Sequence, residues 1–348
     1  MHKTLGWDLG GAHLKAVLVD VDGCALAAVQ HACPLWRGIA HLEQSVASVL
    51  AAVDGASLRH AVTMTGELAD IFPDRDAGVA RLAQYMAERL PAHATRIYAG
   101  RDSFVAAADI RPHAAAIASA NWHASAAFLA AQGDALFIDI GSTTADLIPL
   151  LQGQPAARGY SDAERLQHEE LVYTGVVRTP VMAVAQQVPF GGAWQRLAAE
   201  HFATMGDVYR LTGELPAAFD HADTADGSGK TLPDSARRLA RMLGRDLAEA
   251  DMESWRRLAY ALRAQQLASL QRALERVLSR GLLADSAPLL GAGAGRFLVR
   301  ELALRMRRPY RDATELVSAV PAAVDGVGVC LPAYAVARLA QQDGAWPG

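Results

Sequence analysis

Two short glycine-rich stretches constrain the fold of this chain more than any other feature. In residues 6–20 (GWDLGGAHLKAVLVD) and 137–150 (FIDIGSTTADLIPL), an apolar run ends in an aspartate, Asp8 or Asp139. Each stretch then turns through glycine and small polar residues and resumes as a second apolar run, which predicts strand, tight turn and strand. Two such hairpins about one domain apart predict an α/β chain with two similar domains.

The turns carry residue types suited to phosphate. A carboxylate at the mouth of a turn can hold Mg²⁺ or its water ligands through hard oxygens. Glycines let backbone N–H groups approach an anion that a Cβ would keep away. The expected phosphate-binding residues are Gly10, Gly11 and Ala12 in the first turn and Gly141, Ser142, Thr143 and Thr144 in the second.

Length and charge exclude several classes of protein. With 348 residues and a net charge of −4, the chain has room for two or three domains and no electrostatic case for nucleic acid or an anionic membrane. It contains no uncharged apolar stretch of membrane-spanning length and no signal-peptide pattern, so we expect a cytoplasmic protein. Three cysteines without C-x-x-C spacing favour buried free thiols over a zinc site or disulfides.

The pattern along the chain predicts the main elements. We expect a helix over 39–53, a strand over 60–65, helical residues at 104–108, and an alanine-rich helix over 114–132. Glu67 follows the strand and is a candidate site carboxylate, although a glutamate in a first helical turn has the same appearance. Residues 221–233 are predicted to be a mobile surface loop, and 233–281 two or three helices with arginine on their outer faces.

Together with residues 288–299 (PLLGAGAGRFLV), the two hairpins resemble the acetate kinase, sugar kinase, heat-shock protein and actin superfamily. This resemblance implies a duplicated actin-like (ribonuclease H-like) ATPase fold with two domains around a phosphate-binding cleft. The glycines of the later stretch, Gly291 and Gly293, would then support the nucleotide. Lys15 lies seven residues after Asp8, which is the spacing of a phosphate-binding lysine in actin-type hairpins. The chain has only three lysines, against thirty arginines. An exposed strand lysine is the alternative.

The superfamily resemblance also implies domain boundaries. The first actin-like domain would comprise residues 1–134, with a late helix in 322–348 crossing back to pack on it. The second would comprise residues 135–321 and carry a helical insertion at about 195–285.

A more specific resemblance rests on local strings: GWDLGGAHLKA, CPLWRG, VTMTGELADIFPDR, SANWHASA, FIDIGSTTADLIP and ELVYTGVVRTPV. These are similar to hydantoinase/oxoprolinase-related proteins linked to tetrahydromethanopterin-dependent one-carbon transfer in methylotrophic bacteria, which resemble an archaeal synthase of methanofuran biosynthesis. The resemblance covers nearly the whole chain and is weakest at about 220–245.

The family resemblance implies a transferase. Aminomethylfuranmethanol diphosphate would react with the phenol oxygen of tyramine or its γ-glutamyl derivative, giving an aryl ether and pyrophosphate. Lys15 and Mg²⁺ held by Asp8, Asp139 or Asp146 would offset charge on the leaving group. Glu67 and His13 are the candidate catalytic bases for the phenol.

Two alternatives remain open from the sequence. The first is an ATP-using enzyme, either a kinase or a hydantoinase-like amidohydrolase, with ATP as its cofactor. The second is a noncatalytic nucleotide-responsive protein of the actin or heat-shock type. The expected partners are a small-molecule diphosphate and a phenolic amine, with a homodimer as a further option and no nucleic acid or membrane.

Overall fold

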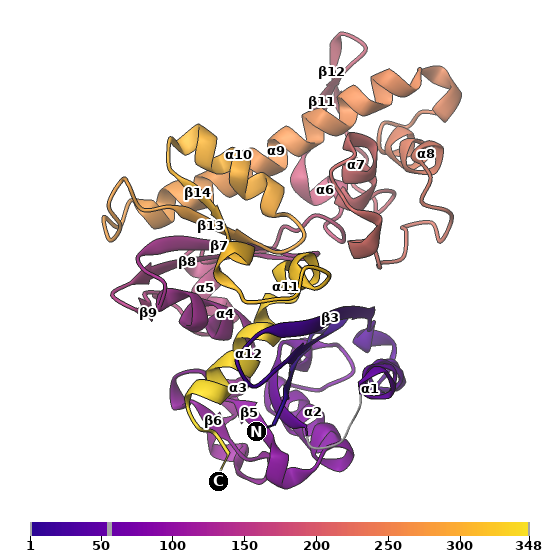
Figure 1. Ribbon diagram of the computed structural model, residues 1–348. Helices are drawn as coiled ribbons and strands as arrows, with labels where there is room; N and C mark the ends of the chain where they lie inside the picture. Colours follow the sequence, from indigo (N-terminus) through magenta and orange to yellow (C-terminus); the bar gives the residue numbers. More distant parts are fainter. Residues whose placement is uncertain (1, 54–57, 347–348) are drawn as a thin grey trace. The chain divides into compact units, whose positions relative to one another are not determined.

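The computed structural model describes residues 2–53 and 58–346 (Figure 1). The chain divides into two compact units, each made of segments that are distant in sequence. The first unit comprises Met1–Ala135, Leu150–Glu164 and Asp312–Gly348, and the second comprises Leu136–Pro149 and Arg165–Arg311. The predicted boundaries at 134 and 321 stay a prediction, and each unit is described by itself.

The first unit is built on a sheet with strand order β3-β2-β1-β4-β5-β6. Its strands are β1 (Thr4–Leu9), β2 (His13–Val19), β3 (Ala25–Ala32), β4 (Arg59–Met64), β5 (Thr95–Tyr98) and β6 (Phe104–Val105). The first three strands pair antiparallel, whereas β4 lies parallel to β1 and β5 parallel to β4. The first predicted hairpin is therefore confirmed as β1 and β2.

Helices cover both faces of this sheet. They are α1 (Ala40–Ala52), α2 (Arg75–Arg89), α3 (Ala114–Ile117), α4 (Asn121–Ala130), α11 (Val324–Val329) and α12 (Leu331–Gln342). The apolar side chains of β1, such as Trp7 and Leu9, are buried with those of α1 and α2. On the other face α12 packs against β1, and a Cβ at Gly6 would collide with the carbonyl of Ala333. This glycine allows the helix to approach the central strand closely.

Short 3-10 helices and connecting pieces complete the first unit. They are η1 (Leu35–Arg37), η2 (Gly66–Leu68), η3 (Ala92–Ala94), η4 (Gly100–Asp102), η5 (Ala107–Asp109), η6 (Arg111–His113), η9 (Ala313–Leu316) and β9 (Gln154–Pro155). Helix α5 (Asp162–Gln167) starts in this unit, and Ser161 and Glu164 form the exchange of hydrogen bonds typical of a capping box at its start.

The second unit repeats the sheet order of the first, as β10-β8-β7-β13-β14. Its strands are β7 (Ala135–Ile140), β8 (Ala145–Leu151), β10 (Leu171–Val172), β13 (Leu289–Ala292) and β14 (Tyr310–Asp312). Strand β13 runs parallel to β7, as β4 does to β1. The second hairpin, the two-sheet duplication and the actin-like α/β fold class are therefore confirmed.

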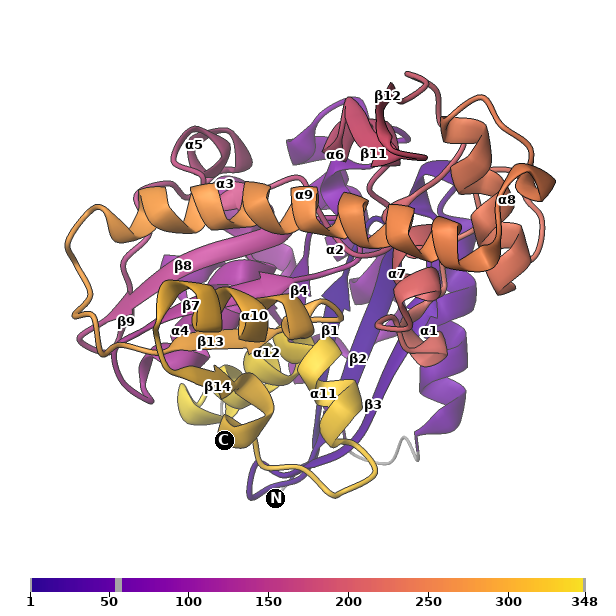
Figure 2. The same ribbon diagram turned by 90° about the horizontal axis from the view of Figure 1, so that it is seen from above.

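The rest of the second unit is mainly helical (Figure 2). Its elements are α6 (Val181–Val184), β11 (Gln187–Phe190), β12 (Ala193–Arg196), α7 (Met205–Thr212), η7 (Ala217–Phe219), α8 (Leu232–Met242), η8 (Leu247–Glu249), α9 (Met252–Leu278) and α10 (Arg296–Met306). Helix α9 is one continuous rod in Figure 2, and its buried face includes Trp255, Leu262 and Leu270. The prediction of two or three helices over 233–281 is confirmed.

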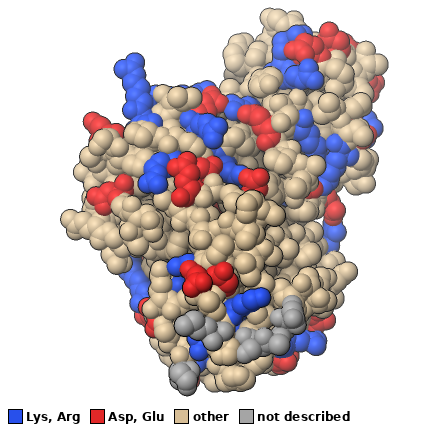
Figure 3. Space-filling view, in the orientation of Figure 1, with Lys and Arg blue, Asp and Glu red and all other residues tan. Residues whose placement is uncertain are grey.

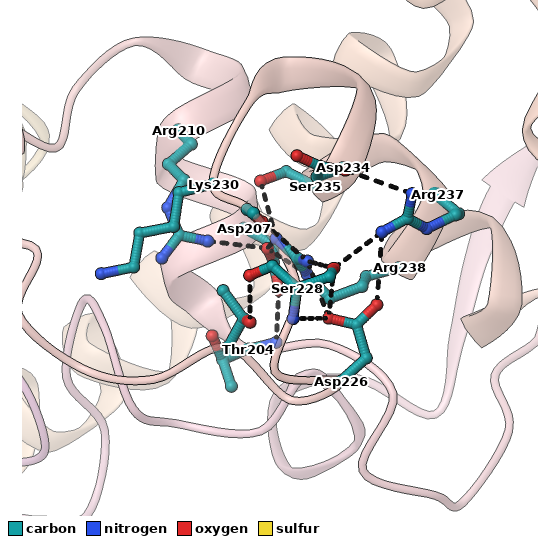
Figure 4. Close-up of polar contacts among 12 residues, drawn as sticks. Thr204, Asp207, Arg210, Asp226, Ser228, Lys230, Asp234, Ser235, Arg237 and Arg238 are labelled. Carbon is teal, nitrogen blue, oxygen red and sulfur yellow. Dashed lines mark hydrogen bonds and ion pairs between the residues drawn. The ribbon is translucent and has the colours of Figure 1, made fainter.

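The prediction that arginine lies on the outer faces of these helices is wrong for Arg238. This α8 residue is fully buried, and its guanidinium donates to Asp207 at 2.8 Å and to Asp226 at 3.0 Å (Figure 4). A buried charge is tolerated when it is paired and hydrogen-bonded in this way. The predicted loop over 221–233 is confirmed up to residue 231, where α8 follows, and Asp226 and Gly229 bind it to the buried arginine.

Two helix predictions in the first unit are wrong. Residues 104–108 begin with β6, because Phe104 and Val105 pair with Tyr98 and Ile97. The alanine-rich stretch 114–132 is not one helix: Ser119 has φ +52°, a left-handed conformation that ends α3 before α4 begins.

The distribution of surface charge and the state of the cysteines agree with what the composition predicts. On the face shown in Figure 3, acidic and basic side chains lie in small mixed groups. Cys24, Cys33 and Cys330 are free thiols; the latter two are buried, as predicted, and Cys24 is half-buried. Within 2–53 and 58–346, every helix is too short or too polar to cross a membrane.

Candidate functional site

In the first turn, two backbone carbonyl groups accept hydrogen bonds from a later segment of the chain, whereas two backbone N–H groups find no acceptor among the described residues. The carbonyl oxygens of Gly11 and Ala12 accept hydrogen bonds from the N–H groups of Leu35 (3.0 Å) and Cys33 (2.9 Å). Among the described residues, none accepts a hydrogen bond from the N–H of Gly11 or Ala12. Adjacent backbone N–H groups of this kind can bind an anion.

A row of polar side chains crosses the sheet beside this turn. Asp8 in β1 lies opposite Lys15 in β2 and opposite Thr63 in β4. The Asp8 carboxylate is 2 % exposed, with the Lys15 ammonium 3.8 Å away and the Nδ2 of Asn121 donating to it at 3.4 Å. Lys15 therefore offsets the charge of a buried carboxylate while its own side chain stays 20 % exposed.

Backbone contacts bring Glu67 next to the first turn. The N–H of Thr65 donates to the carbonyl of Leu9 at 3.0 Å. A Cβ at Gly66 would lie 3.0 Å from that carbonyl and 3.4 Å from the carbonyl carbon of Gly10, so only glycine fits without displacement. Glu67 follows directly in η2, and its side chain is 1 % exposed.

Glu67 belongs to a small network of buried polar side chains. Ser119 Oγ lies 2.8 Å from Glu67 Oε1 and 3.3 Å from Asp162 Oδ2, and Arg75 donates to the same Asp162 oxygen at 3.1 Å. The Oε2 atom of Glu67 is buried, and no described residue donates to it. Burial raises the pKa of Glu67 and outweighs the hydrogen bond from Ser119. The arrangement is suited to accepting and holding a proton.

The sequence did not identify Ser119, Asp162 or Arg75 as site residues. Ser119 is separated from Glu67 by 52 residues and from Asp162 by 43. The left-handed backbone of Ser119 costs energy for a residue with a side chain, which is a frequent feature of functional sites. No local sequence pattern predicts this cluster, because its members are distant in sequence and come together only in the folded protein.

The second turn is closed by the same backbone hydrogen bond as the first. The N–H of Gly141 donates to the carbonyl of Thr144 at 2.9 Å, as that of Gly10 does to the carbonyl of His13 at 3.0 Å. Within the described part of the chain, the N–H of Thr143 donates to no protein acceptor. Both turns thus offer backbone donors. The expected role of the buried His13 side chain stays a prediction.

A segment of residues 174–179, which we call the strap, packs on the second turn. Its N–H groups at Val176, Val177 and Arg178 donate to the carbonyls of Gly141 and Ser142 at 2.8–3.1 Å. The turn carbonyls are again occupied by protein, as in the first unit.

Two residues hold the strap in place. A Cβ at Gly175 would collide with the backbone between Ser142 and Thr143, so glycine allows the close approach. The fully buried Gln266 of α9 donates through Nε2 to Thr174 Oγ1 at 2.7 Å and to the Gly175 carbonyl at 2.9 Å. A buried amide on a distant helix was not predicted, since its partners are contributed by tertiary packing.

The later glycine-rich stretch approaches Asp139 through one of the two predicted glycines. Gly293 has φ +81°, and a Cβ there would collide with Asp139 Oδ1. The N–H of Gly295 donates to the carbonyl of Ile140 at 2.8 Å. Gly291, by contrast, lies inside β13, where a Cβ would be 2.9 Å from the Tyr310 ring. Its expected phosphate contact stays a prediction.

Asp146, seven residues after Asp139, occupies the position in the second hairpin that Lys15 occupies in the first. It lies opposite Leu171 and forms an ion pair with the buried guanidinium of Arg165. This pairing makes Asp146 a poor metal ligand, because one of its oxygens is already engaged by a cation.

The described residues contain no cluster of three or more histidine, cysteine or acidic side chains that could hold a metal ion. Mg²⁺ nevertheless often binds through one or two carboxylates, with waters and substrate phosphates completing its coordination. Asp8 and the half-buried Asp139 each fit that simpler requirement within their own unit.

Sequence comparisons give the family. The profile of the hydantoinase/oxoprolinase family matches residues 59–342. The chain is 29% identical over 246 residues to the (4-{4-[2-(gamma-L-glutamylamino)ethyl]phenoxymethyl}furan-2-yl)methanamine synthase of Methanocaldococcus jannaschii, covering 70% of this chain and 72% of that protein. It is 33% identical over 112 residues to the synthase of the same name from Methanococcus vannielii, covering 32% of this chain and 50% of that protein.

Solved structures extend the comparison of fold. A nucleotide-free acetone carboxylase matches 95% of this chain and 70% of its own chain with a TM-score of 0.59 at 10% identity. Component A of the (R)-2-hydroxyglutaryl-CoA dehydratase of Acidaminococcus fermentans matches 98% of this chain and 100% of its own with a TM-score of 0.45 at 13% identity. With most of its length matched by the family profile, the chain belongs to the hydantoinase/oxoprolinase family.

Proposed function

We propose that this protein is a transferase of methanofuran-type cofactor biosynthesis. It joins aminomethylfuranmethanol diphosphate to tyramine or γ-glutamyltyramine and releases pyrophosphate. The name of the archaeal relatives describes a product in which a phenoxy oxygen is bonded to a furanylmethyl carbon, which is the ether that this reaction would form. The observation that carries the proposal is the buried Glu67 carboxyl beside the first turn.

The proposed step balances in bonds and protons. The bond between the furan methylene carbon and the diphosphate oxygen breaks, and its electron pair stays on the diphosphate. The phenol oxygen forms the new bond to that carbon, and the phenol proton moves to the Glu67 carboxylate. A phenol has a pKa of about 10, so removing its proton at neutral pH requires a base of raised pKa.

Different residues of the first unit bind the leaving group and accept the proton. Lys15 and the N–H groups of Gly11 and Ala12 bind the oxygens of the departing diphosphate. Glu67 accepts the proton, Ser119 orients the Glu67 carboxyl, and Arg75 compensates the charge of the neighbouring Asp162. Within the second unit, the N–H of Thr143 is a separate candidate donor for phosphate.

Mg²⁺ fits this proposal as a cofactor. Asp8 in the first unit or Asp139 in the second would hold it, and when bound it would offset negative charge on the diphosphate. Asp146 is left out of this set because of its ion pair with Arg165.

A product assay tests the function. The protein is incubated with the furan diphosphate and tyramine, and in parallel with γ-glutamyltyramine, in Mg²⁺ buffer without ATP. We expect ether, detected by mass spectrometry, and pyrophosphate in a 1:1 ratio. Ether formation only with ATP, or ATP consumption without ether, would support the kinase or amidohydrolase alternative instead.

A pH profile tests the role of Glu67. A base acts only when ionised, so kcat/KM should fall as the pH drops below the raised pKa of Glu67. The isosteric Glu67→Gln should be about a hundredfold slower and should lack this limb of the profile. Asp162→Asn serves as the comparison, because it alters the network but retains Glu67. An unchanged profile in Glu67→Gln would exclude Glu67 as the base.

A further inference from the structure

The first unit contains a cavity of about 330 Å³ that is lined by none of the residues assigned above. Its lining includes Tyr98, Arg101, Ser103, Phe104, His123 and Asp343. These residues come from the end of β5, from η4 and β6, from α4 and from the chain after α12. A volume of this size accommodates a small organic molecule.

The cavity opens on a different side of α4 from the first hairpin. Asn121, at the start of α4, contacts Asp8, whereas His123 lines the cavity. Two residues along an α-helix correspond to a rotation of about 200°, so these two side chains leave the helix in nearly opposite directions. Ala127, one turn after His123, lines the cavity as well.

His123 presents an unused hydrogen-bond donor. Its Nδ1 lies 2.8 Å from the Tyr98 hydroxyl, whose pKa is raised by burial and which therefore keeps its proton. Burial, with a smaller contribution from the charge of Arg101, lowers the pKa of His123 to about 4, so the ring is neutral. Tyr98 then donates to Nδ1, and Nε2 carries the ring proton.

The Nε2–H group of His123 has no protein acceptor within the described residues, although the residue is only 8 % exposed. Since the ring lines the cavity, a ligand in the cavity can provide the missing acceptor.

Arg101 adds a positive charge beside this donor. Its guanidinium lies 5.6 Å from the centre of the Tyr160 ring, and the His123 ring centre lies 5.7 Å from the same ring. Arg101 is exposed and has no ion-pair partner among residues 2–53 and 58–346. The carboxylate of Asp343 also lines the cavity and accepts a hydrogen bond from the hydroxyl of Ser103.

Aromatic side chains form the apolar part of the cavity. The rings of Tyr98 and Phe104 lie 5.1 Å apart, centre to centre, at an angle of 56°. Aromatic faces of this kind pack well against a flat ring. The cavity thus combines an apolar wall with two donors, Arg101 and His123, that favour an anion.

We propose that this cavity is a binding site for a small aromatic carboxylate, separate from the phosphate-binding turns and independent of the transferase proposal. The carboxylate accepts hydrogen bonds from Arg101 and the Nε2–H of His123, and the ring of the ligand packs against Tyr98 and Phe104.

Three probes of the same shape test the charge that the cavity selects. Binding of phenylacetate, phenylacetamide and phenethylamine to the full chain is measured by calorimetry. We expect phenylacetate to bind at least about tenfold more tightly than the neutral amide, since it gains charge-assisted contacts. Equal binding of the amide, preference for phenethylamine, or no detectable phenylacetate binding would each overturn the proposal.

Two arginine variants locate the site. Arg101→Gln should weaken phenylacetate binding about tenfold, and this exposed position carries little risk to folding. Arg272→Gln, at an exposed arginine of α9 in the other unit, is the matched control and should bind normally. Nitrogen-15 spectra of the histidine rings should show the His123 Nε2–H signal shifting with phenylacetate. Normal binding by Arg101→Gln, or an unshifted His123 signal, would contradict the assignment.

Discussion

The two hairpins have the same pattern of backbone hydrogen bonds but differ in the charge of the residue seven positions after the aspartate. Each turn is closed by a hydrogen bond from a glycine N–H to the carbonyl three residues later, and each uses its carbonyls to hold a neighbouring segment. Seven residues after the aspartate, however, the first hairpin has Lys15 and the second has Asp146. Lys15 is partly exposed beside a buried carboxylate, whereas Asp146 is paired with a buried arginine.

This difference teaches how a duplicated element can divide its roles. In the first hairpin the charged pair leaves a cation within reach of a ligand. In the second the buried member of the pair is the cation, Arg165, and the partly exposed member is the carboxylate of Asp146. We therefore expect charge changes in the first hairpin to affect ligand binding, and those at Asp146 to affect stability.

The largest expected effect is on turnover, where the two hairpins should behave alike. Asp8→Asn and Asp139→Asn should each slow the reaction about a thousandfold, because each removes a carboxylate expected to organise Mg²⁺ and phosphate. The measurement is the rate of pyrophosphate release, with circular dichroism as the control for folding. Near-normal rates in both folded variants would contradict the proposal that both aspartates are needed for turnover.

The next effect separates the hairpins by stability. Asp146→Asn removes the carboxylate that is paired with the buried Arg165 and should lower the free energy of unfolding by about 3 kcal/mol. Lys15→Met should cost less than Asp146→Asn, because the Lys15 ammonium is 3.8 Å from Asp8 and Asp8 keeps the hydrogen bond from Asn121. Urea denaturation measures both.

A double variant checks the cause of that loss. Asp146→Leu combined with Arg165→Met removes both charges and should recover most of the stability. If the double variant is as unstable as the single one, packing at this position rather than the unpaired charge would be responsible.

A smaller effect concerns how the second turn is held. Gly175→Ala should cost about 2 kcal/mol of stability, because the new Cβ meets the backbone between Ser142 and Thr143. It should also weaken phosphate binding by displacing the strap. Gly213→Ala is a useful contrast: its Cβ would meet nothing within 4 Å, although its φ of +77° strains any side chain. Tight binding of pyrophosphate by Gly175→Ala would show that the strap does not support the turn.

The sequence predicted the parts of the fold that depend on local pattern. Both hairpins, the helix α1 and the helical region containing α8 and α9 follow from apolar periodicity and glycine placement. The break at Ser119 could not be predicted, since an alanine-rich stretch reads as helix throughout and the left-handed residue is fixed by tertiary contacts. The burial of Arg238 was missed for a similar reason, because its partner Asp207 is 31 residues away.

The same limit applies to the site. Asp8, Lys15 and Glu67 could be selected because each lies at a strand end or a recognisable spacing. Ser119 and Asp162, which surround Glu67, carry no such signal. Sequence therefore identified the groups expected to meet the ligand and missed the residues that position them.

The most direct test of the account is the inhibition constant of pyrophosphate against the furan diphosphate, measured without ATP. Competitive inhibition is expected, and Lys15→Ala should weaken it about ten- to hundredfold, since one charge-assisted contact of about 1.5–3 kcal/mol is lost. Lys15→Arg should rescue only part of the loss. Lys3→Ala, at an exposed lysine of the same unit, should leave the constant unchanged. A reaction that requires ATP, or pyrophosphate inhibition that is equal in Lys15→Ala and the wild type, would contradict the assignment.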